Sequence, residues 1–201
     1  DALGNVTIVA ADVNNGSADN CTSVTLAASP TAFTCSNIGT NNVTLTVTDG
    51  SGNTSTAVAV VTVADIASPT AIAQNIAINL DALGNATIVA ADVNNGSSDN
   101  CGPVTLAIDV STFTCTDIGA NNVILTVTDA NSNTSTATAV VTVADIASPT
   151  AIAQNITVNL DALGNVTIVA ADVNNGSADN CTSVTLAASP TAFTCSNIGT
   201  N

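Results

Sequence analysis

"VILTVTDANSNTSTATAVVTV", residues 123–143, decides the fold that the sequence predicts. Before the central "DANSN", aliphatic side chains at 123, 125 and 127 alternate with residues 124, 126 and 128. After it, aliphatic side chains at 137, 139, 141 and 143 alternate mainly with threonine. A period of two rich in β-branched residues is typical of a strand, and the Asn/Asp/Ser cluster is typical of a turn. The stretch therefore predicts two consecutive strands.

Shorter alternations extend this pattern on the N-terminal side. They lie at residues 76–80, around Ile88 and Ala90, at residues 104–108, and at Phe113 and Cys115, which should share one face of a strand. No segment has helical spacing. Six or seven short strands in about 80 residues are typical of an immunoglobulin-like β-sandwich. We therefore predict an all-β fold.

The sequence repeats with a period of 80 residues. "DALGN" begins at Asp1, Asp81 and Asp161, and residues 161–201 repeat residues 1–41 without a change. This period fits a small domain, and the proline in "VADIASPT" marks the boundary between copies. We predict tandem immunoglobulin-like repeats that form an extended rod within a longer array. Residues 1–67 would be a repeat without its first strand, 68–147 a complete repeat, and 148–201 a repeat without its last strands.

The composition restricts the chemistry. The chain has no Lys, Arg or His, and its formal charge of −15 comes entirely from Asp. Most side chains that act as general acids, bases or oxyanion donors are missing, so we expect no enzyme activity. The charge argues against binding to nucleic acid or anionic membranes. No apolar run reaches the roughly 18 residues of a membrane span. Ca²⁺ is the expected partner of the carboxylates, unless they serve only solubility.

Six cysteines occur in pairs: Cys21/Cys35, Cys101/Cys115 and Cys181/Cys195. An even number at a fixed spacing, without His, favours disulfides over zinc or a nucleophile. The intervening residues indicate strand, turn and strand, so we predict a bridge within each copy that ties a hairpin together. Closing such a loop contributes about 3 kcal/mol. Free buried thiols and inter-chain bridges are the alternatives. Disulfides in turn predict an oxidising, extracellular location.

Carboxylates are predicted to gather where one sandwich meets the next. The loop "DVNNGSSDNC" (residues 92–101) and the turn at Asp129 should share the sandwich end that receives the linker. We predict two Ca²⁺ sites, one formed by Asp65, Asp92, Asp99 and Asp129 and the next by Asp145, Asp172 and Asp179. Amide oxygens of Asn94, Asn95 and Asn100 would add ligands. The alternative is that Asp, Asn and Gly only close turns, without metal.

The repeat resembles the hyalin repeat (HYR) family through "DNC" and the later "FTCSNIGTNNVTLTVTDGSGNTSTAVAVVTV". The matching positions in the first copy are Asp19, Asn20, Cys21, Phe33, Gly39, Thr40, Thr48, Asp49, Gly52 and Asn53. The second copy departs at Ala120 and Ser132. The second cysteine also lies earlier than in the family, so the family's bridge pattern does not carry over. The near-identical copies are similar to giant Bacteroidetes adhesins, including gliding-motility adhesins. The resemblance implies an immunoglobulin-like fold, a cell-surface location, and a role in adhesion or as a stalk.

Two functions follow as expectations. The first is a stalk or filament segment of a secreted bacterial adhesin, which carries an adhesive tip away from the cell and is stiffened by Ca²⁺ at its junctions. Its partners would be neighbouring repeats and lateral copies in a filament. The second is weak binding of surface polysaccharide by each repeat, with avidity from copy number. The scarcity of aromatic residues and the lack of Arg favour the first, because such residues anchor binding sites.

Overall fold

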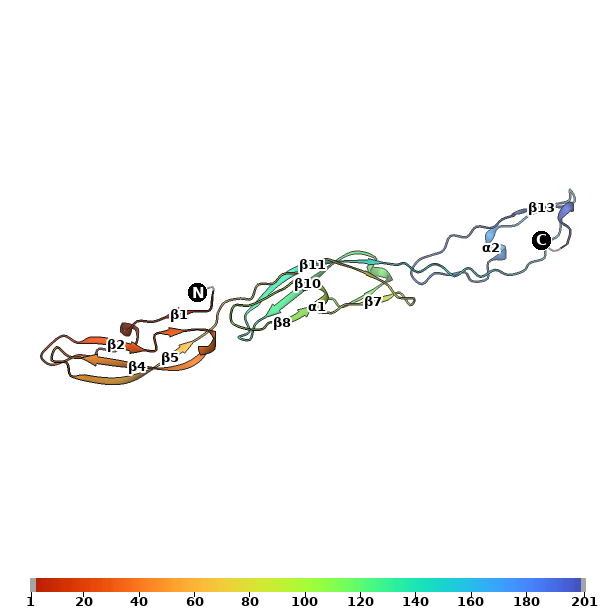
Figure 1. Ribbon diagram of the computed structural model, residues 1–201. Coiled ribbons are helices and arrows are strands. Elements are labelled where there is room, and N and C mark those ends of the chain that lie inside the picture. The colour runs from red at the N-terminus through yellow and green to blue at the C-terminus, as the bar shows by residue number, and fades with distance from the viewer. Residues whose placement is uncertain (1–2, 200–201) are drawn as a thin grey trace. The chain divides into compact units, whose positions relative to one another are not determined.

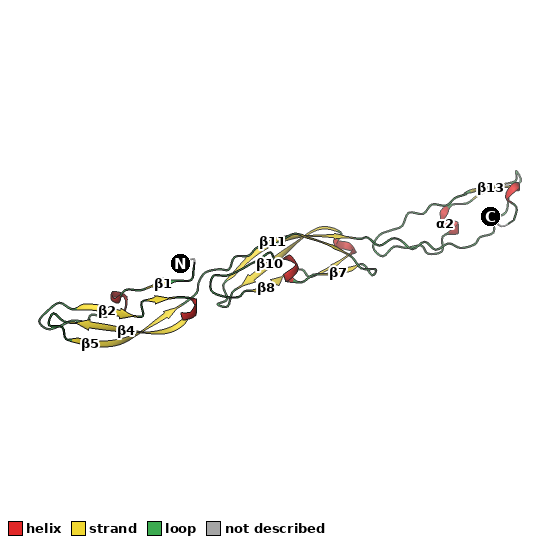
Figure 2. Cartoon of the chain, in the orientation of Figure 1, coloured by secondary structure: helices red, strands yellow, loops and turns green. Residues whose placement is uncertain are grey.

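The computed structural model describes residues 3–199 and is mostly β (Figure 1). Its strands form several small sheets, and its helical segments are single short turns (Figure 2). The prediction of a mostly β fold is confirmed. Within these residues, no helix is long and apolar enough to cross a membrane.

The chain divides into two compact units, and each unit gathers three separate stretches of sequence. Unit 1 contains Asp1–Gln74, Val89–Asp109 and Val123–Ala139. Unit 2 contains Asn75–Ile88, Val110–Asn122 and Val140–Asn201. The domain boundaries predicted after residues 67 and 147 stay a prediction.

Unit 1 contains a three-stranded sheet of order β2-β4-β5. The strands are Thr25–Ser29 (β2), Gly39–Thr48 (β4) and Thr54–Val63 (β5), and both pairs are antiparallel. Val43 and Leu45 of β4 point into the core, beside the fully buried Phe33 of β3 (Ala32–Phe33), which pairs with β1 (Val6–Thr7). The aliphatic side chains at the centre of this unit are therefore supplied by alternate strand positions, as the period of two requires.

A four-stranded sheet has the order β6-β11-β10-β8. Its strands are Ile76–Asn79 (β6), Thr134–Ala144 (β11), Gly119–Thr128 (β10) and Thr105–Ile108 (β8). β6 runs parallel to β11, and β8 runs antiparallel to β10. The alternation predicted for β10 is confirmed, because Val123, Leu125 and Val127 have no exposed surface.

Unit 2 contains two small antiparallel pairs. β7 (Asn85–Thr87) pairs with β9 (Thr112–Thr114), and β12 (Asn165–Thr167) pairs with β13 (Ala192–Thr194). The buried side chains of this unit include Leu80, Ile88 and Phe113. Phe113 is the counterpart, 80 residues later, of the buried Phe33 in unit 1.

Short helical turns interrupt two segments that the sequence predicts as strands. α1 covers Ala90–Val93, and a 3₁₀ turn covers Cys115–Asp117; the related turns are Ala10–Val13, Cys35–Asn37, Ala170–Val173 (α2) and Cys195–Asn197. The prediction that Ala90 and Cys115 belong to strands is wrong. The backbone N–H of Val89 donates to Asp92 Oδ2 at 2.7 Å, and that of Thr114 donates to Asp117 Oδ2 at 2.7 Å. These side-chain caps turn the backbone away from the extended state.

Candidate metal centre beside a disulfide

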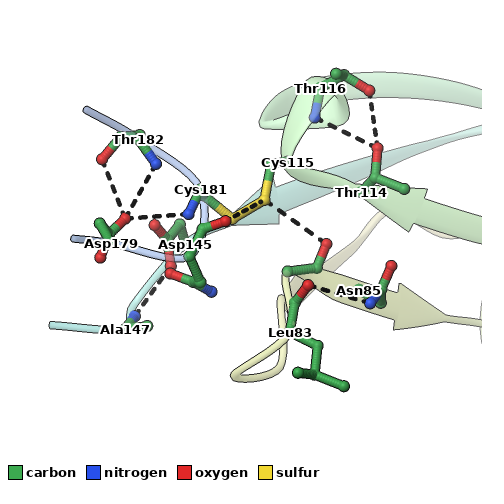
Figure 3. Close-up of a disulfide and its surroundings, with 12 residues drawn as sticks. Leu83, Asn85, Thr114, Cys115, Thr116, Asp145, Ala147, Asp179, Cys181 and Thr182 are labelled. Carbon is green, nitrogen blue, oxygen red and sulfur yellow. Dashed lines mark hydrogen bonds between the residues drawn. A yellow bond between two sulfur atoms is a disulfide. The ribbon is translucent and has the colours of Figure 1, made fainter. Parts of the chain in front are cut away.

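Two disulfides join cysteines 66 residues apart. Cys35 bonds Cys101 within unit 1, with 5.1 Å between their Cα atoms, and Cys115 bonds Cys181 within unit 2, with 5.0 Å. Each bond links one 80-residue copy of the sequence to the following copy (Figure 3). Because disulfides persist in oxidising compartments, the two bonds indicate an extracytoplasmic location.

The predicted pairing of cysteines within each copy is wrong. Cys21 and Cys195 are free and exposed, and the other four cysteines pair between copies. The prediction assumed that the strands between two cysteines of one copy form a hairpin. In the structure they do not pair with each other, because β2 pairs with β4, whereas β3 pairs with β1. The chain passes from one sheet to another between the two cysteines, so they lie in different places.

The turn "DALGN" forms one side of each disulfide. In the second copy, Asp81 Oδ1 accepts hydrogen bonds from the N–H groups of Leu83 and Asn85, both at 2.9 Å. This closed turn places the Gly84 carbonyl oxygen 3.8 Å from Cys115 Sγ. Gly84 has φ +77°, and a Cβ there would overlap with the same sulfur atom. Only glycine fits both the backbone conformation and the space beside the bridge.

The loop that ends in "DNC" forms the other side. Asp99 Oδ2 accepts the N–H of Cys101 at 2.8 Å, and Asp179 Oδ2 accepts the N–H of Cys181 at 3.2 Å. The backbone N–H groups of Cys181 and Thr182 lower the pKa of Asp179, since they stabilise its ionised form. These carboxylates therefore fix the cysteine backbone where the bridge forms (Figure 3).

Three of the predicted carboxylates gather in unit 1. One oxygen atom from each of Asp65, Asp99 and Asp129 lies within 4.8 Å of the others, and the three side chains are half-buried to buried. The linker supplies Asp65, the "DNC" loop supplies Asp99, and the turn between β10 and β11 supplies Asp129. The convergence expected from the strand order is therefore observed for these three residues. The cluster can hold a metal ion such as Ca²⁺, which prefers carboxylate oxygens.

Asp129 is the most buried member of this cluster, with 7% of its surface exposed. Burial pushes its pKa upward, but hydrogen bonds donated by the Asn133 side chain and by the backbone of Asn133, Asn131 and Ser132 outweigh burial and lower the pKa below 3.8. The side-chain bond from Asn133 Nδ2 to Asp129 Oδ2 measures 2.7 Å. Asp129 is therefore ionised at neutral pH in spite of its burial.

Asp65 has a buried oxygen atom without a partner. Its Oδ1 accepts the N–H of Ala67 at 3.0 Å, whereas its Oδ2 is buried and has no hydrogen bond. The Asp65 backbone carbonyl accepts Asn133 Nδ2 at 3.2 Å, which ties the linker to the turn of Asp129. An unpartnered carboxylate oxygen beside two other carboxylates is costly unless a cation is bound. The chain has no Lys, Arg or His that could supply the positive charge.

Asp92 does not belong to the cluster. Its Oδ2 caps α1, as described above, and Asp172 caps α2 in the same way by accepting the N–H of Val169 at 2.8 Å. Asn94 also makes turn contacts, because its Oδ1 accepts the N–H of Ser97 at 3.0 Å. The alternative of turn chemistry without metal therefore describes these residues. The ligand set in unit 1 is smaller than the sequence predicts.

In unit 2, Asp145 and Asp179 occupy positions equivalent to Asp65 and Asp99. Asp145 Oδ1 accepts the N–H of Ala147 at 3.0 Å, as Asp65 does with Ala67 (Figure 3). Asp179 Oδ1 and Asn180 Oδ1 are buried without a hydrogen bond. Unpartnered oxygen atoms therefore occur beside both disulfides.

Sequence reasoning missed two kinds of residue at these sites. Gly84 and its equivalents Gly4 and Gly164 make room for a cysteine sulfur atom, and Asn133 holds both Asp129 and the linker. "DALGN" recurs unchanged at all three copies, although its fourth and fifth residues have no partner within the motif that is visible in the sequence. That recurrence is a signal that could have directed attention to the glycine.

Comparisons with known proteins add no functional assignment. No family model matches the chain, and no curated protein matches it. One solved structure with a distant likeness is an endo-fucoidan hydrolase from glycoside hydrolase family 107. It has 15% sequence identity and a TM-score of 0.30, and the match covers 82% of this chain and 26% of the hydrolase.

Proposed function

We propose that this chain is a structural spacer from a secreted, cell-surface protein, built from tandem immunoglobulin-like sandwiches that resemble hyalin repeats. The spacer holds an adhesive region away from a bacterial cell and performs no catalysis itself. Its stiffness comes from junctions at which consecutive copies are joined by a disulfide and by a bound Ca²⁺ ion. Neighbouring repeats are its main partners, and lateral copies in a filament are a further one.

The observation that carries this proposal is the disulfide between copies next to the carboxylate cluster. Gly4, Cys35, Asp65 and Cys101 line one small cavity of unit 1, and Asp99 holds the backbone of Cys101. A covalent bond and a multivalent ion at the same place restrict bending more than a peptide linker alone. Such a joint suits a protein whose task is to maintain distance.

Ca²⁺ is the ion that fits the ligands best. The candidate ligands are carboxylate oxygens, with backbone carbonyls nearby, and the cluster offers no His. Hard cations with flexible coordination use such oxygens, and extracellular calcium modules bind at roughly 10⁻⁴–10⁻³ M. The ion would neutralise Asp65, Asp99 and Asp129 and would satisfy the unpartnered Asp65 Oδ2.

A Ca²⁺ titration of thermal stability tests the metal site. Added Ca²⁺ should stabilise the chain by about 1.4–2.7 kcal/mol at ten to one hundred times Kd, and a chelator should reverse the effect. Asp65→Asn should weaken the response at least tenfold, because it removes a ligand charge but keeps an acceptor for Ala67. Asp109→Asn is the matched control, since Asp109 Oδ1 also accepts a backbone N–H, from Ile124 at 2.7 Å, outside the cluster. A titration without any stabilisation would refute the Ca²⁺ site.

Small-angle X-ray scattering tests the spacer role. The chain should keep one long maximum dimension in Ca²⁺, and this dimension should become broadly distributed after reduction in the presence of chelator. A scattering profile that shows flexible copies under both conditions would contradict a stiffened spacer.

A further inference from the structure

The two free cysteines lie in the same local settings as the bonded ones. Cys195 Sγ is 3.8 Å from the Gly164 carbonyl oxygen, as Cys115 Sγ is from that of Gly84, and both glycines have φ +77°. A Cβ on Gly164 would come within 2.6 Å of Cys195 Sγ, so this glycine also makes room for the sulfur. Cys195 therefore already has one complete side of a bridge.

Cys21 has the opposite side. Asp19 Oδ2 accepts the N–H groups of Cys21 and Thr22, both at 3.0 Å, as Asp179 does for Cys181 and Thr182 at 3.2 and 3.1 Å. The segment "ADNCTSV" is identical around Cys21 and Cys181, and "FTCSNIG" is identical around Cys35 and Cys195. Each segment is thus bonded at one position of the chain and free at another. Both free cysteines are exposed.

We propose that Cys195 and Cys21 are complementary halves of the same kind of bridge, and that Cys195 of one copy of this chain bonds Cys21 of a second copy, head to tail. The observed pairs always join a "TC" cysteine beside a "DALGN" turn to a "DNC" cysteine. Cys195 belongs to the first type and Cys21 to the second. Since every chain carries one of each, the reaction can continue into linear multimers. The inference rests on the disulfides and not on the spacer function or on Ca²⁺.

The bond forms by thiol–disulfide exchange with a small oxidised disulfide such as oxidised glutathione. The Cys21 thiol loses its proton, and the thiolate attacks one glutathione sulfur atom and releases one reduced glutathione. The Cys195 thiolate then attacks the Cys21 sulfur of the mixed disulfide and releases the second. Two protein thiols are oxidised, and one glutathione disulfide is reduced to two thiols.

The test uses the whole chain in a glutathione redox buffer, with products separated on a non-reducing gel. The unchanged chain should form a ladder of multimers that grows with protein concentration and disappears on reduction. Cys21→Ser and Cys195→Ser should each remain monomeric when alone. An equimolar mixture of the two variants, one of them isotopically labelled, should give a mixed dimer as its main product. Both substitutions replace exposed, unbonded residues, so both variants should fold.

Three results would overturn the proposal. The unchanged chain could remain monomeric at high concentration with both thiols capped by glutathione. It could close on itself into a monomer without free thiols. Either single variant could also dimerise alone as readily as the mixture does, which would show pairing without regard to cysteine type. None of these results bears on the Ca²⁺ titration, so failure of this inference is distinguishable from failure of the proposed function.

Discussion

Gly84 illustrates how a single residue prepares a bridge between two copies of the sequence. Its φ of +77° closes the "DALGN" turn, and the missing side chain leaves space for Cys115 Sγ. Gly96 has a similar φ of +83° but has nothing within 4 Å of the place where a Cβ would stand. The two glycines therefore separate the effect of backbone strain from the effect of space.

We predict that Gly84→Ala prevents or weakens the Cys115–Cys181 bond, whereas Gly96→Ala does not. Both changes should cost about 1–2 kcal/mol of stability through left-handed backbone strain. Only Gly84→Ala should add reactive thiols, those of Cys115 and Cys181, to the thiols of Cys21 and Cys195 that are already free. Thiol titration under native conditions measures this difference. Equal thiol numbers in the two variants would show that the glycine does not make room for the bridge.

The lowered pKa values predict how stability depends on pH. Hydrogen bonds outweigh burial and lower the pKa of Asp129, and the side chain and backbone of Asn53 lower that of Asp49 in the first copy. A carboxyl whose folded pKa lies below its unfolded pKa of about 3.9 stabilises the fold above that value and loses the effect as pH falls. Urea unfolding in chelator and high salt should show stability that is level near pH 6 and declines below about pH 4.

Asp129→Asn should reduce the acid-induced decline, because one of the depressed groups is gone. The control is Asp109→Asn, since no pKa shift is attributed to Asp109. A stability that increases as pH falls through 4 would mean that repulsion among the carboxylates outweighs their hydrogen bonds.

Residue types alone predicted part of the candidate site. Asp65, Asp99 and Asp129 could be brought together from strand order, because loops at one end of a sandwich are neighbours. Asp92 could not be separated from them in this way. Its carboxylate was already used to cap a helical turn too short to show a period in the sequence.

At the scale of elements, the error concerns strand pairing. β8 and β9 follow each other closely, which is the usual sign of a hairpin. β8 instead pairs with β10, and β9 pairs with β7. Individual strands could be predicted from their alternation, but partner choice depends on long-range packing that short strands do not encode. The misassigned hairpin led directly to the misassigned disulfides.

Phe113 of β9 provides a test of the packing in unit 2. It is 1% exposed in a core otherwise built from aliphatic side chains. Phe113→Ala should reduce the free energy of unfolding by about 3–5 kcal/mol, since the lost contacts leave a cavity. Leu83→Ala, at a side chain that is 82% exposed, should change it by less than about 0.5 kcal/mol. Chemical denaturation compares the two, and similar losses would show that Phe113 is not part of a packed core.

At the scale of the whole molecule, the 80-residue period was evident from the sequence, whereas the connection between copies was not. A bond between Cys35 and Cys101 restricts 66 residues of chain in the unfolded state. Replacing both cysteines by serine should lower the free energy of unfolding by about 2–4 kcal/mol. Cys21→Ser should leave it nearly unchanged, because this thiol is free and exposed. Comparable losses from the two changes would contradict the observed pairing.

Peptic mapping of the disulfides tests most directly whether consecutive copies are covalently joined. Pepsin works in acid, where thiol exchange is suppressed because few thiolates exist, and cleavage at Phe33, Phe113 and Leu106 separates the cysteines of one copy from each other. The flanks of Cys101 ("DNCGPV") and Cys115 ("TCTDIG") occur once each in the chain. The structure predicts that "DNCGPV" is linked to "TCSNIG" and "TCTDIG" to "DNCTSV". A peptide in which "DNCGPV" is linked to "TCTDIG" would show bridges within a copy and would contradict the account.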